Sequence, residues 1–147
     1  PYTTLFRSTD ALLQATGLLE WVDDESLMDA VTAVSGSGPA YFFLMVEAVV
    51  DAGVAAGLPR PVATELAAQT MAGAAAMLLD RMTESGSGSV VGPLDTSAAQ
   101  LRASVTSPGG TTAAGLRELE RGGLRSAVAS AVEAAKTRSE QLRITSE

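Results

Sequence analysis

The chain has 147 residues and a formal net charge of −7, and 46% of its residues are hydrophobic although only 4% are aromatic. The acidic balance and the lack of a basic tract argue against a nucleic-acid partner or an anionic membrane surface. Cysteine and histidine are both absent, which excludes disulfides, thiolate metal ligands and an imidazole acid or base. We therefore predict no metal site, and any catalysis would use hydroxyls, carboxylates, backbone donors or a bound cofactor.

Two missing signals bear on the cellular location. No uninterrupted apolar run approaches the roughly 20 residues that span a bilayer, and the N-terminus has no secretion-signal pattern. We therefore expect a cytoplasmic protein with no membrane partner. Alanine is the commonest apolar residue and buries little area, so packing against a second copy is favoured.

Residues 1–8 (PYTTLFRS) are expected not to be native. They are the translation of CCCTACACGACGCTCTTCCGATCT, which is the end of a common sequencing adapter, and such segments are excluded from fold reasoning. The alternative is a chance match in an ordinary terminal segment.

Residues 9–34 have the pattern of a helix, a strand and a second helix. The first helix is predicted over Ala11–Ala15 and a short apolar strand over Leu18–Val22. The second helix is predicted from the acidic run Asp23–Glu25 to about Val34, because negative charge favours a helix N-terminus. A lone strand cannot satisfy its own hydrogen bonds, so we expect it to pair with a sheet upstream.

Residues 35–39 (SGSGP) mark the start of a helical region. Pro39 suits the first turn of a helix, with Ser37 or Gly38 as its N-cap. The helix predicted from Ala40 to about Ala56 is apolar nearly all round, so it should be buried on most sides. In a chain of this length, we expect another subunit to cover it.

Four further helices follow, over residues 62–82, 97–105, 113–121 and 124–143. A Gly- and Ser-rich loop at 83–93 and the pair Gly122-Gly123 separate them. Three arginines near the last break alternate with two glutamates, which predicts a solvated or salt-bridged face rather than a binding patch: Arg117, Arg121 and Arg125 with Glu118 and Glu120.

The segment from Ser107 to Thr112 (SPGGTT) is the strongest candidate for a binding site. Backbone N–H groups at a helix start are unpaired and carry a partial positive charge, so they attract carboxylates and phosphates. Gly109 and Gly110 lack the Cβ atoms that would keep a ligand away, and they can take positive φ to form an anion nest. The threonine hydroxyls add donors, so a small anionic substrate fits here. The alternative is an ordinary helix start with a threonine cap.

A complete dinucleotide-binding fingerprint is missing from the chain. That fingerprint requires G-x-G-x-x-G/A directly after a strand and before a helix. The GSG at 36–38 has Tyr41 where the third glycine belongs, and the GSG at 86–88 has Val91. The chain is therefore not expected to hold a dinucleotide by itself.

Two segments resemble the motifs of one enzyme family. Residues 29–41 (DAVTAVSGSGPAY) resemble the junction motif of the pyrroline-5-carboxylate reductases. Residues 101–119, centred on 105–112 (VTSPGGTT), look like the signature of that family. Both motifs occur in the family's order and at a compatible spacing, and the resemblance covers about residues 9–147.

The resemblance implies a mainly α fold. Residues 35–147 would form a helical dimerisation and substrate-binding bundle, preceded over residues 9–34 by the last helix–strand–helix remnant of a Rossmann-type α/β domain. The chain would be the C-terminal part of an oxidoreductase that reduces 1-pyrroline-5-carboxylate to L-proline with NADPH or NADH, in proline biosynthesis, and would be inactive alone. The implied partners are this substrate and a second copy, in a homodimer or a larger ring.

The resemblance also assigns roles to the candidate residues. The substrate carboxylate would sit at the amides of Gly109, Gly110 and Thr111, with the Ser107 hydroxyl closing the site. Thr112 would face the ring nitrogen, orient the imine and relay a proton from water, because a threonine hydroxyl is too weak an acid to be the final donor at neutral pH. The residues that approach the nicotinamide would be Ser35, Gly36, Ser37 and Gly38.

Two other functions stay open at this point. The chain could be a self-standing, non-catalytic helical dimerisation module, in which Thr112 would have no function. It could also belong to a reductase of another cyclic imine. The nucleotide preference cannot be assigned, because it would be set in the nucleotide-binding domain.

Overall fold

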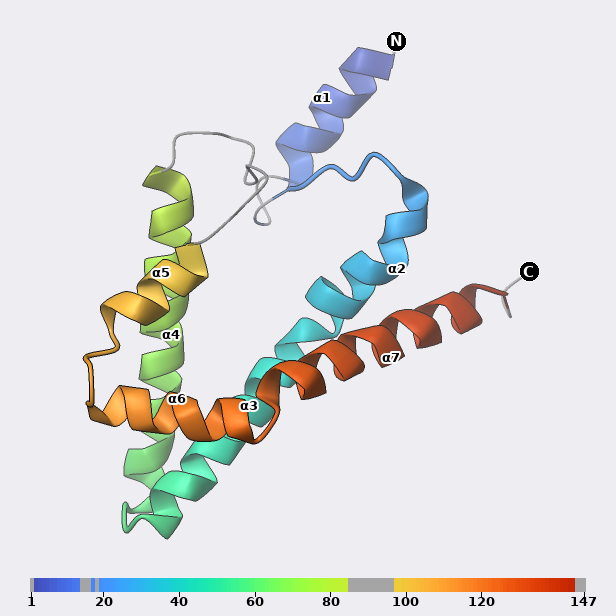
Figure 1. Ribbon diagram of the computed structural model, residues 1–147. Helices are drawn as coiled ribbons and strands as arrows, with labels where there is room; N and C mark the ends of the chain where they lie inside the picture. The colour runs from blue at the N-terminus through green and yellow to red at the C-terminus, as the bar shows by residue number, and fades with distance from the viewer. Residues whose placement is uncertain (1, 14–16, 18, 85–96, 145–147) are drawn as a thin grey trace.

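The computed structural model describes all residues except 1, 14–16, 18, 85–96 and 145–147, and the part described is mostly helical (Figure 1). This confirms the mainly α fold class. The helices in chain order are α1 (Tyr2–Leu13), the 3-10 helix η1 (Glu25–Leu27), α2 (Met28–Val31), the π-helix η2 (Thr32–Gly36), α3 (Gly38–Ala55), α4 (Arg60–Glu84), α5 (Ser97–Ser104), α6 (Thr111–Arg121) and α7 (Leu124–Ile144).

Helices α3 and α4 form a hairpin (Figure 1), and Gly57 lies in the turn between them. Gly57 has a φ of 104°, a left-handed conformation that favours glycine. Its N–H donates to the Val54 carbonyl at 2.9 Å, and the Leu58 N–H donates to the Gly53 carbonyl at 3.0 Å. This pair of hydrogen bonds is the Schellman C-cap, which ends α3. The two helices then pack through a small core of Val50, Ala63 and Ala67, flanked by Val46 and Val54.

The acidic run before α2 caps the first helical turn. The N–H of Ser26 donates to Asp24 Oδ1 at 2.8 Å. This backbone hydrogen bond, followed by one from the Ser26 side chain, lowers the pKa of Asp24 below its ordinary value of 3.8. The chain then continues through α2 and η2 into α3, with Ser37 between η2 and α3.

The C-terminal helices pack against this frame at two places. Helix α7 returns along α2 and η2, and α5 packs on α4 (Figure 1). Helix α6 packs on its neighbour α7. As a result, α7 is the helix that links α6 to the segment where α2, η2 and α3 meet.

A large apolar surface is exposed in the single chain. The solvent-accessible surface is 11526 Å², whereas a compact monomer of this mass has about 7000 Å². On α3, the side chains of Phe42, Phe43 and Leu44 are 63%, 66% and 66% exposed. Only Gly38 and Val50 of α3 are buried, so the predicted burial of this helix is not achieved within one chain. Large apolar side chains exposed together on one helix are typical of a protein–protein interface.

Two stretches are long and apolar enough, by length and composition alone, to cross a membrane. They are Glu25–Ala55 and Arg60–Arg81. The sequence prediction counted uninterrupted apolar runs and therefore missed them, since charged residues such as Glu47 and Glu65 interrupt both. Helices that are apolar on most faces are also typical of protein interfaces.

Two predicted elements differ from the structure. The strand predicted over Leu18–Val22 is wrong where it is described, because residues 19–22 have no regular structure and the described residues contain no strand. A strand needs a pairing partner, and these helices offer none. Leu18 and residues 85–93 of the predicted loop lie outside the described residues, while residues 83–84 belong to α4. The first helix runs over Tyr2–Leu13 and does not begin at Ala11.

The remaining helices confirm the predictions. The boundaries of α3, α4, α5, α6 and α7 agree with the predicted ones to within two residues. Pro39 lies in the first turn of α3, and Ser37 is the N-cap. These boundaries are the ones that proline and glycine mark in the sequence.

Candidate functional site: the glycine turn before α6

The candidate loop is a tight turn that leads directly into α6. The N–H of Gly110 donates to the Ser107 carbonyl at 3.0 Å, which closes a four-residue turn. Pro108 occupies its second position, and Gly109, with a φ of 71°, its third. Proline followed by a positive-φ glycine is the signature of a type II turn. The expected left-handed glycine is therefore present at Gly109.

Gly110 has a different conformational requirement. Its φ of −78° and ψ of 176° are extended, so the expectation of positive φ is wrong at this position. A Cβ atom here would lie 3.2 Å from the Ser107 carbonyl oxygen and 3.5 Å from Ser107 Cβ. Glycine is therefore required at position 110 because the turn passes close to Ser107, and not because of the backbone torsion angles.

Gly110 is also the N-cap of α6, and the helix start has no side-chain cap. The threonine-cap alternative is therefore wrong. The N–H of Gly110 is used inside the turn, and its carbonyl accepts from the Ala114 N–H at 3.1 Å. The amides left without a helical acceptor are those of Thr111, Thr112 and Ala113, the first three residues after the cap. An anion at this helix start would meet these donors rather than the Gly110 amide.

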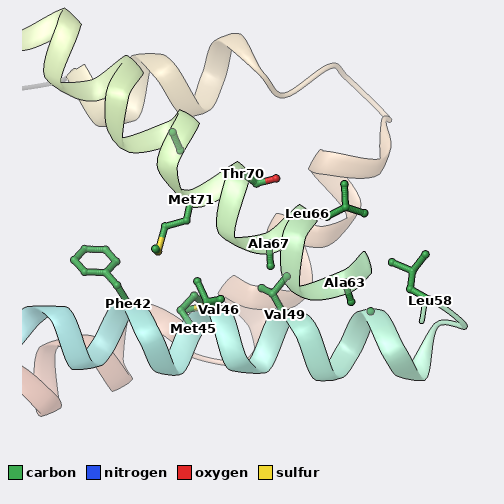
Figure 2. Close-up of a pocket in the computed structure, with 12 residues that line it drawn as sticks. Phe42, Met45, Val46, Val49, Leu58, Ala63, Leu66, Ala67, Thr70 and Met71 are labelled. Carbon is green, nitrogen blue, oxygen red and sulfur yellow. The ribbon is translucent and has the colours of Figure 1, made fainter. Parts of the chain in front are cut away.

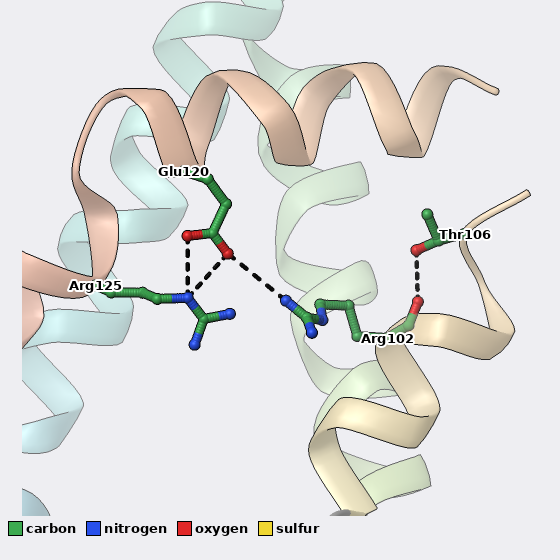
Figure 3. A network of polar contacts seen from close by, with 4 residues as sticks. All are labelled: Arg102, Thr106, Glu120 and Arg125. Carbon is green, nitrogen blue, oxygen red and sulfur yellow. Dashed lines mark hydrogen bonds and ion pairs between the residues drawn. The ribbon is translucent and has the colours of Figure 1, made fainter. Parts of the chain in front are cut away.

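The helix before the turn ends in local hydrogen bonds. The Thr106 hydroxyl donates to the Arg102 carbonyl at 2.5 Å (Figure 3), and the Ser104 hydroxyl donates to the Leu101 carbonyl at 2.8 Å. The Thr106 bond satisfies a carbonyl at the helix C-terminus, and the Leu101 carbonyl also accepts from the Val105 N–H at 3.3 Å. These bonds fix the direction in which the chain enters the turn.

Three helices meet at Glu120. Its carboxylate accepts from Arg125 Nε at 2.9 and 3.0 Å, and Oε1 lies 3.6 Å from Arg102 Nη1 (Figure 3). Arg121 pairs with Glu118 at 3.1 Å. The predicted salt-bridged face is confirmed for Arg121 and Arg125. The contact from Arg102 was not predicted, because it comes from another helix.

The Ser35–Gly38 turn has an unusual backbone. The N–H of Ser37 donates to the Thr32 carbonyl at 2.9 Å, five residues back, as in a π-helix. Single π-turns are rare and occur frequently at functional sites. A Cβ on Gly38 would meet no atom within 4 Å, and one on Gly36 would meet only Thr32 Cγ2 at 3.6 Å. The glycines therefore leave room for another group to approach.

Two polar groups near this turn were not predicted. Asp29 is only 6% exposed, and both of its carboxylate oxygens are held by α7. The hydroxyl of Tyr41, in the first turn of α3, is buried without a hydrogen-bond partner in the described part of the chain. A charged residue among apolar neighbours was the sequence signal for Asp29, but its partners lie 110 or more residues away.

The two halves of the predicted site do not pack on each other within one chain. Among the described helices, α6 contacts α7 and touches neither η2 nor α3. The structure thus forms the glycine turn with Ser107, Gly109, Gly110, Thr111 and Thr112, and separately the turn with Ser35, Gly36, Ser37 and Gly38.

An apolar groove lies between α3 and α4 and has a volume of about 380 Å³ (Figure 2). Its walls carry aliphatic, aromatic and thioether side chains, and Thr70 is its polar residue. Since it has no charged group, it does not suit a carboxylate or a nucleotide phosphate. Among the residues that line it are Phe42, Met45, Val49, Leu66 and Met71.

Comparison with known proteins gives a consistent result. Residues 25–142 match the model of a family described as pyrroline-5-carboxylate reductase dimerisation. The pyrroline-5-carboxylate reductase of Mycobacterium leprae is 68% identical over 146 residues, which cover 97% of this chain and 49% of that protein.

Two solved structures extend the match to the fold. A pyrroline-5-carboxylate reductase from Coxiella burnetii superposes with a TM-score of 0.80 at 38% identity, covering 95% of this chain and 47% of that one. A pyrroline carboxylate reductase from Plasmodium falciparum with NADP bound superposes with a TM-score of 0.75 at 34% identity, covering 94% and 49%. The chain spans about half the length of the relatives it matches. It belongs to the pyrroline-5-carboxylate reductase dimerisation family.

Proposed function

We propose that the chain is the C-terminal, substrate-binding half of an oxidoreductase that reduces 1-pyrroline-5-carboxylate to L-proline, in proline biosynthesis. The observation that carries the proposal is the glycine turn before α6, whose geometry leaves helix-start amides free for a carboxylate. The names of the relatives support the same reaction. Since the chain spans about half of those relatives, it would be inactive without a nucleotide-binding domain.

The cofactor would be NADPH or NADH, and residues 9–34 would be the last part of the domain that binds it. Ser35–Gly38 fits the approach of a nicotinamide, because Ser35 and Gly36 are exposed and a Cβ on Gly38 would meet no atom within 4 Å. The unpartnered Tyr41 hydroxyl nearby is a donor without an acceptor in the described chain. When bound, the reduced nicotinamide supplies the hydride for the C=N bond.

The chain's own residues bind and orient the imine. The substrate carboxylate would lie at the start of α6, where it meets the Thr111 amide and the partial positive charge of the helix. Ser107 would close the site from the other side of the turn. Thr112 would hold the ring nitrogen and pass it a proton taken from water, since its own hydroxyl is too weak an acid to lose one permanently at neutral pH. The products would be L-proline and the oxidised nucleotide.

The working form would be a homodimer, or a larger ring built from dimers. A second copy would cover the apolar surface of α3 and the groove between α3 and α4. It would also explain why one chain leaves α6 apart from the Ser35–Gly38 turn. The enzyme would be cytoplasmic. We expect no membrane partner, because the apolar surface is assigned to the second copy, and no nucleic-acid partner, because the net charge is −7.

The direct test is Thr112→Val in the full-length enzyme. We expect kcat to fall about tenfold or more, because the hydroxyl that orients and protonates the imine is lost. Thr111→Val is the matched control, since it makes the same change one residue earlier and keeps the amide. Unchanged turnover in Thr112→Val would refute the proposed role. Competition between cyclic imines in the same assay separates this reaction from reduction of another cyclic imine.

A further inference from the structure

Asp29 is a buried charged side chain at the contact between α2 and α7. It is 6% exposed and lies in the four-residue helix α2, among residues that pack on α7. Burial of a carboxylate is unfavourable unless the charge is paired and its oxygens are hydrogen-bonded. A buried carboxylate at this position therefore requires specific partners.

Both partners come from the far end of the sequence. The Ser139 hydroxyl donates to Asp29 Oδ1 at 2.7 Å, and Arg143 Nη2 lies 3.3 Å from Oδ2. Ser139 and Arg143 are four residues apart on α7, so they face the same side of that helix. Arg143 stays 58% exposed while the Asp29 side chain is 9% exposed. The carboxylate is thus held at two points by one face of α7.

The helical segment that follows Asp29 links its contact with α7 to the Ser35–Gly38 turn. Ala33, four residues after Asp29, is fully buried and lies in η2, which also packs on α7. Helix α2 and the π-turn η2 continue into α3 as one helical stretch, Glu25–Ala55, but the π-turn interrupts the regular hydrogen-bond ladder between α2 and α3. The orientation of Ser35–Gly38 is therefore tied to how α2 and η2 pack on α7, and Asp29 makes polar contacts within that packing.

We propose that Asp29, held by Ser139 and Arg143 of α7, is a positioning residue that sets the Ser35–Gly38 turn for the nucleotide. The inference rests on the proposed function, which brings the nicotinamide to this turn. Because α7 also packs on α6, and Arg125 of α7 pairs with Glu120 of α6, the same helix connects the nucleotide-facing turn to the helix that begins at the substrate loop. Arg125 lies at the N-terminal end of α7, whereas the Asp29 contacts at Ser139 and Arg143 lie near its C-terminal end. Loss of the Asp29 contact should therefore weaken nucleotide binding more than imine binding.

The test uses the full-length enzyme with Asp29→Asn, Arg143→Met and the double variant. Asp29→Asn keeps the size and one acceptor for Ser139 but removes the charge that faces Arg143. Glu140→Gln is the matched control. It removes a carboxylate from α7, the helix of Arg143, and the partner of this carboxylate is Lys136, at 3.4 Å. The measured quantities are the NADPH and NADH Kd from nucleotide fluorescence, and KM for nucleotide and for 1-pyrroline-5-carboxylate.

We expect Asp29→Asn and Arg143→Met each to raise the nucleotide Kd at least about threefold. The double variant should raise the nucleotide Kd no more than the larger single change does, because both single changes remove the same ion pair. The imine KM should stay within about twofold, and Glu140→Gln should change nothing. If Asp29→Asn does not fold, Arg143→Met carries the test, since its side chain is mostly exposed.

Three results would overturn the inference. They are an unchanged nucleotide Kd, an equal rise in both KM values, and a lower Tm with unaltered Kd and KM. An enzyme that binds NADPH but does not reduce 1-pyrroline-5-carboxylate would refute the proposed function instead. In that case the nucleotide Kd of the variants still decides the role of Asp29.

Discussion

Replacing Gly109 by alanine in the full-length enzyme should destabilise the substrate turn through its backbone alone. Gly109 has a φ of 71°, and a Cβ there would meet no atom within 4 Å. The alanine side chain would therefore clash with no neighbour. The free-energy cost of the substitution is then the penalty for an L-residue in a left-handed conformation, about 1–2 kcal/mol. If the site binds only the closed turn, this penalty raises the substrate KM about 5–30-fold.

Asparagine at position 109 tests whether the left-handed backbone conformation is the cause. Asparagine tolerates left-handed φ better than alanine does, so Gly109→Asn should lie between the wild type and Gly109→Ala in unfolding free energy and in KM. Gly110→Ala behaves differently, because its backbone is extended but its Cβ would lie 3.2 Å from the Ser107 oxygen. Asparagine at position 110 should bring no rescue, since it has the same Cβ.

The assay combines urea unfolding with steady-state kinetics in the imine substrate. The reasoning fails if Gly109→Ala matches the wild type in both measurements, or if Gly109→Asn is as damaging as Gly109→Ala. Rescue of position 110 by asparagine would equally contradict the assignment of separate causes to the two glycines.

Two smaller predictions concern charges. Glu120→Gln should lower the unfolding free energy by less than about 1 kcal/mol, because the side chains of Arg102 and Arg125 are 46% and 69% exposed and such pairs contribute little. The difference should vanish near 1 M salt, where screening is strong, and a loss that persists there would contradict an electrostatic cause. The Asp24 carboxyl should titrate below 3.8 in an NMR titration, since the Ser26 N–H and side chain hold its pKa down. Because its folded pKa lies below the unfolded one, this contact stabilises the fold above pH 3.8 and is lost as the pH falls through the folded pKa; a value at or above 3.8 would contradict the cap.

The sequence predicted the helices where local chemistry marks their ends. Pro39 lies in the first turn of α3, Gly57 follows its end and Gly122-Gly123 separates α6 from α7. In each case the signal lies within a few residues of the boundary. The segment at 19–22 failed for the opposite reason. Its apolar residues suit a strand, but a strand is decided by a partner, and the described chain contains none.

In the candidate site too, features set by neighbouring residues were predictable and features set by distant contacts were not. The left-handed Gly109 was predictable, because proline followed by glycine specifies a turn. That Gly110 is extended, and that its amide is used inside the turn, depends on how the turn closes onto Ser107. The contact from Asp29 to Ser139 spans 110 residues, and no local pattern indicates which distant helix a buried carboxylate will meet.

The small core of one chain bears directly on how the site is held. In the described residues, the buried hydrophobic side chains are Ala33, Val50, Ala63 and Ala67, and three of these four are alanines. Alanine side chains bury little area, so they offset little of the conformational entropy that folding loses. Phe42, Phe43 and Leu44 have the larger area, and they remain exposed. Burial of these side chains against a second copy would therefore supply much of the folding free energy, so the geometry of the glycine turn and of the Ser35–Gly38 turn would depend on assembly as well as on the chain itself.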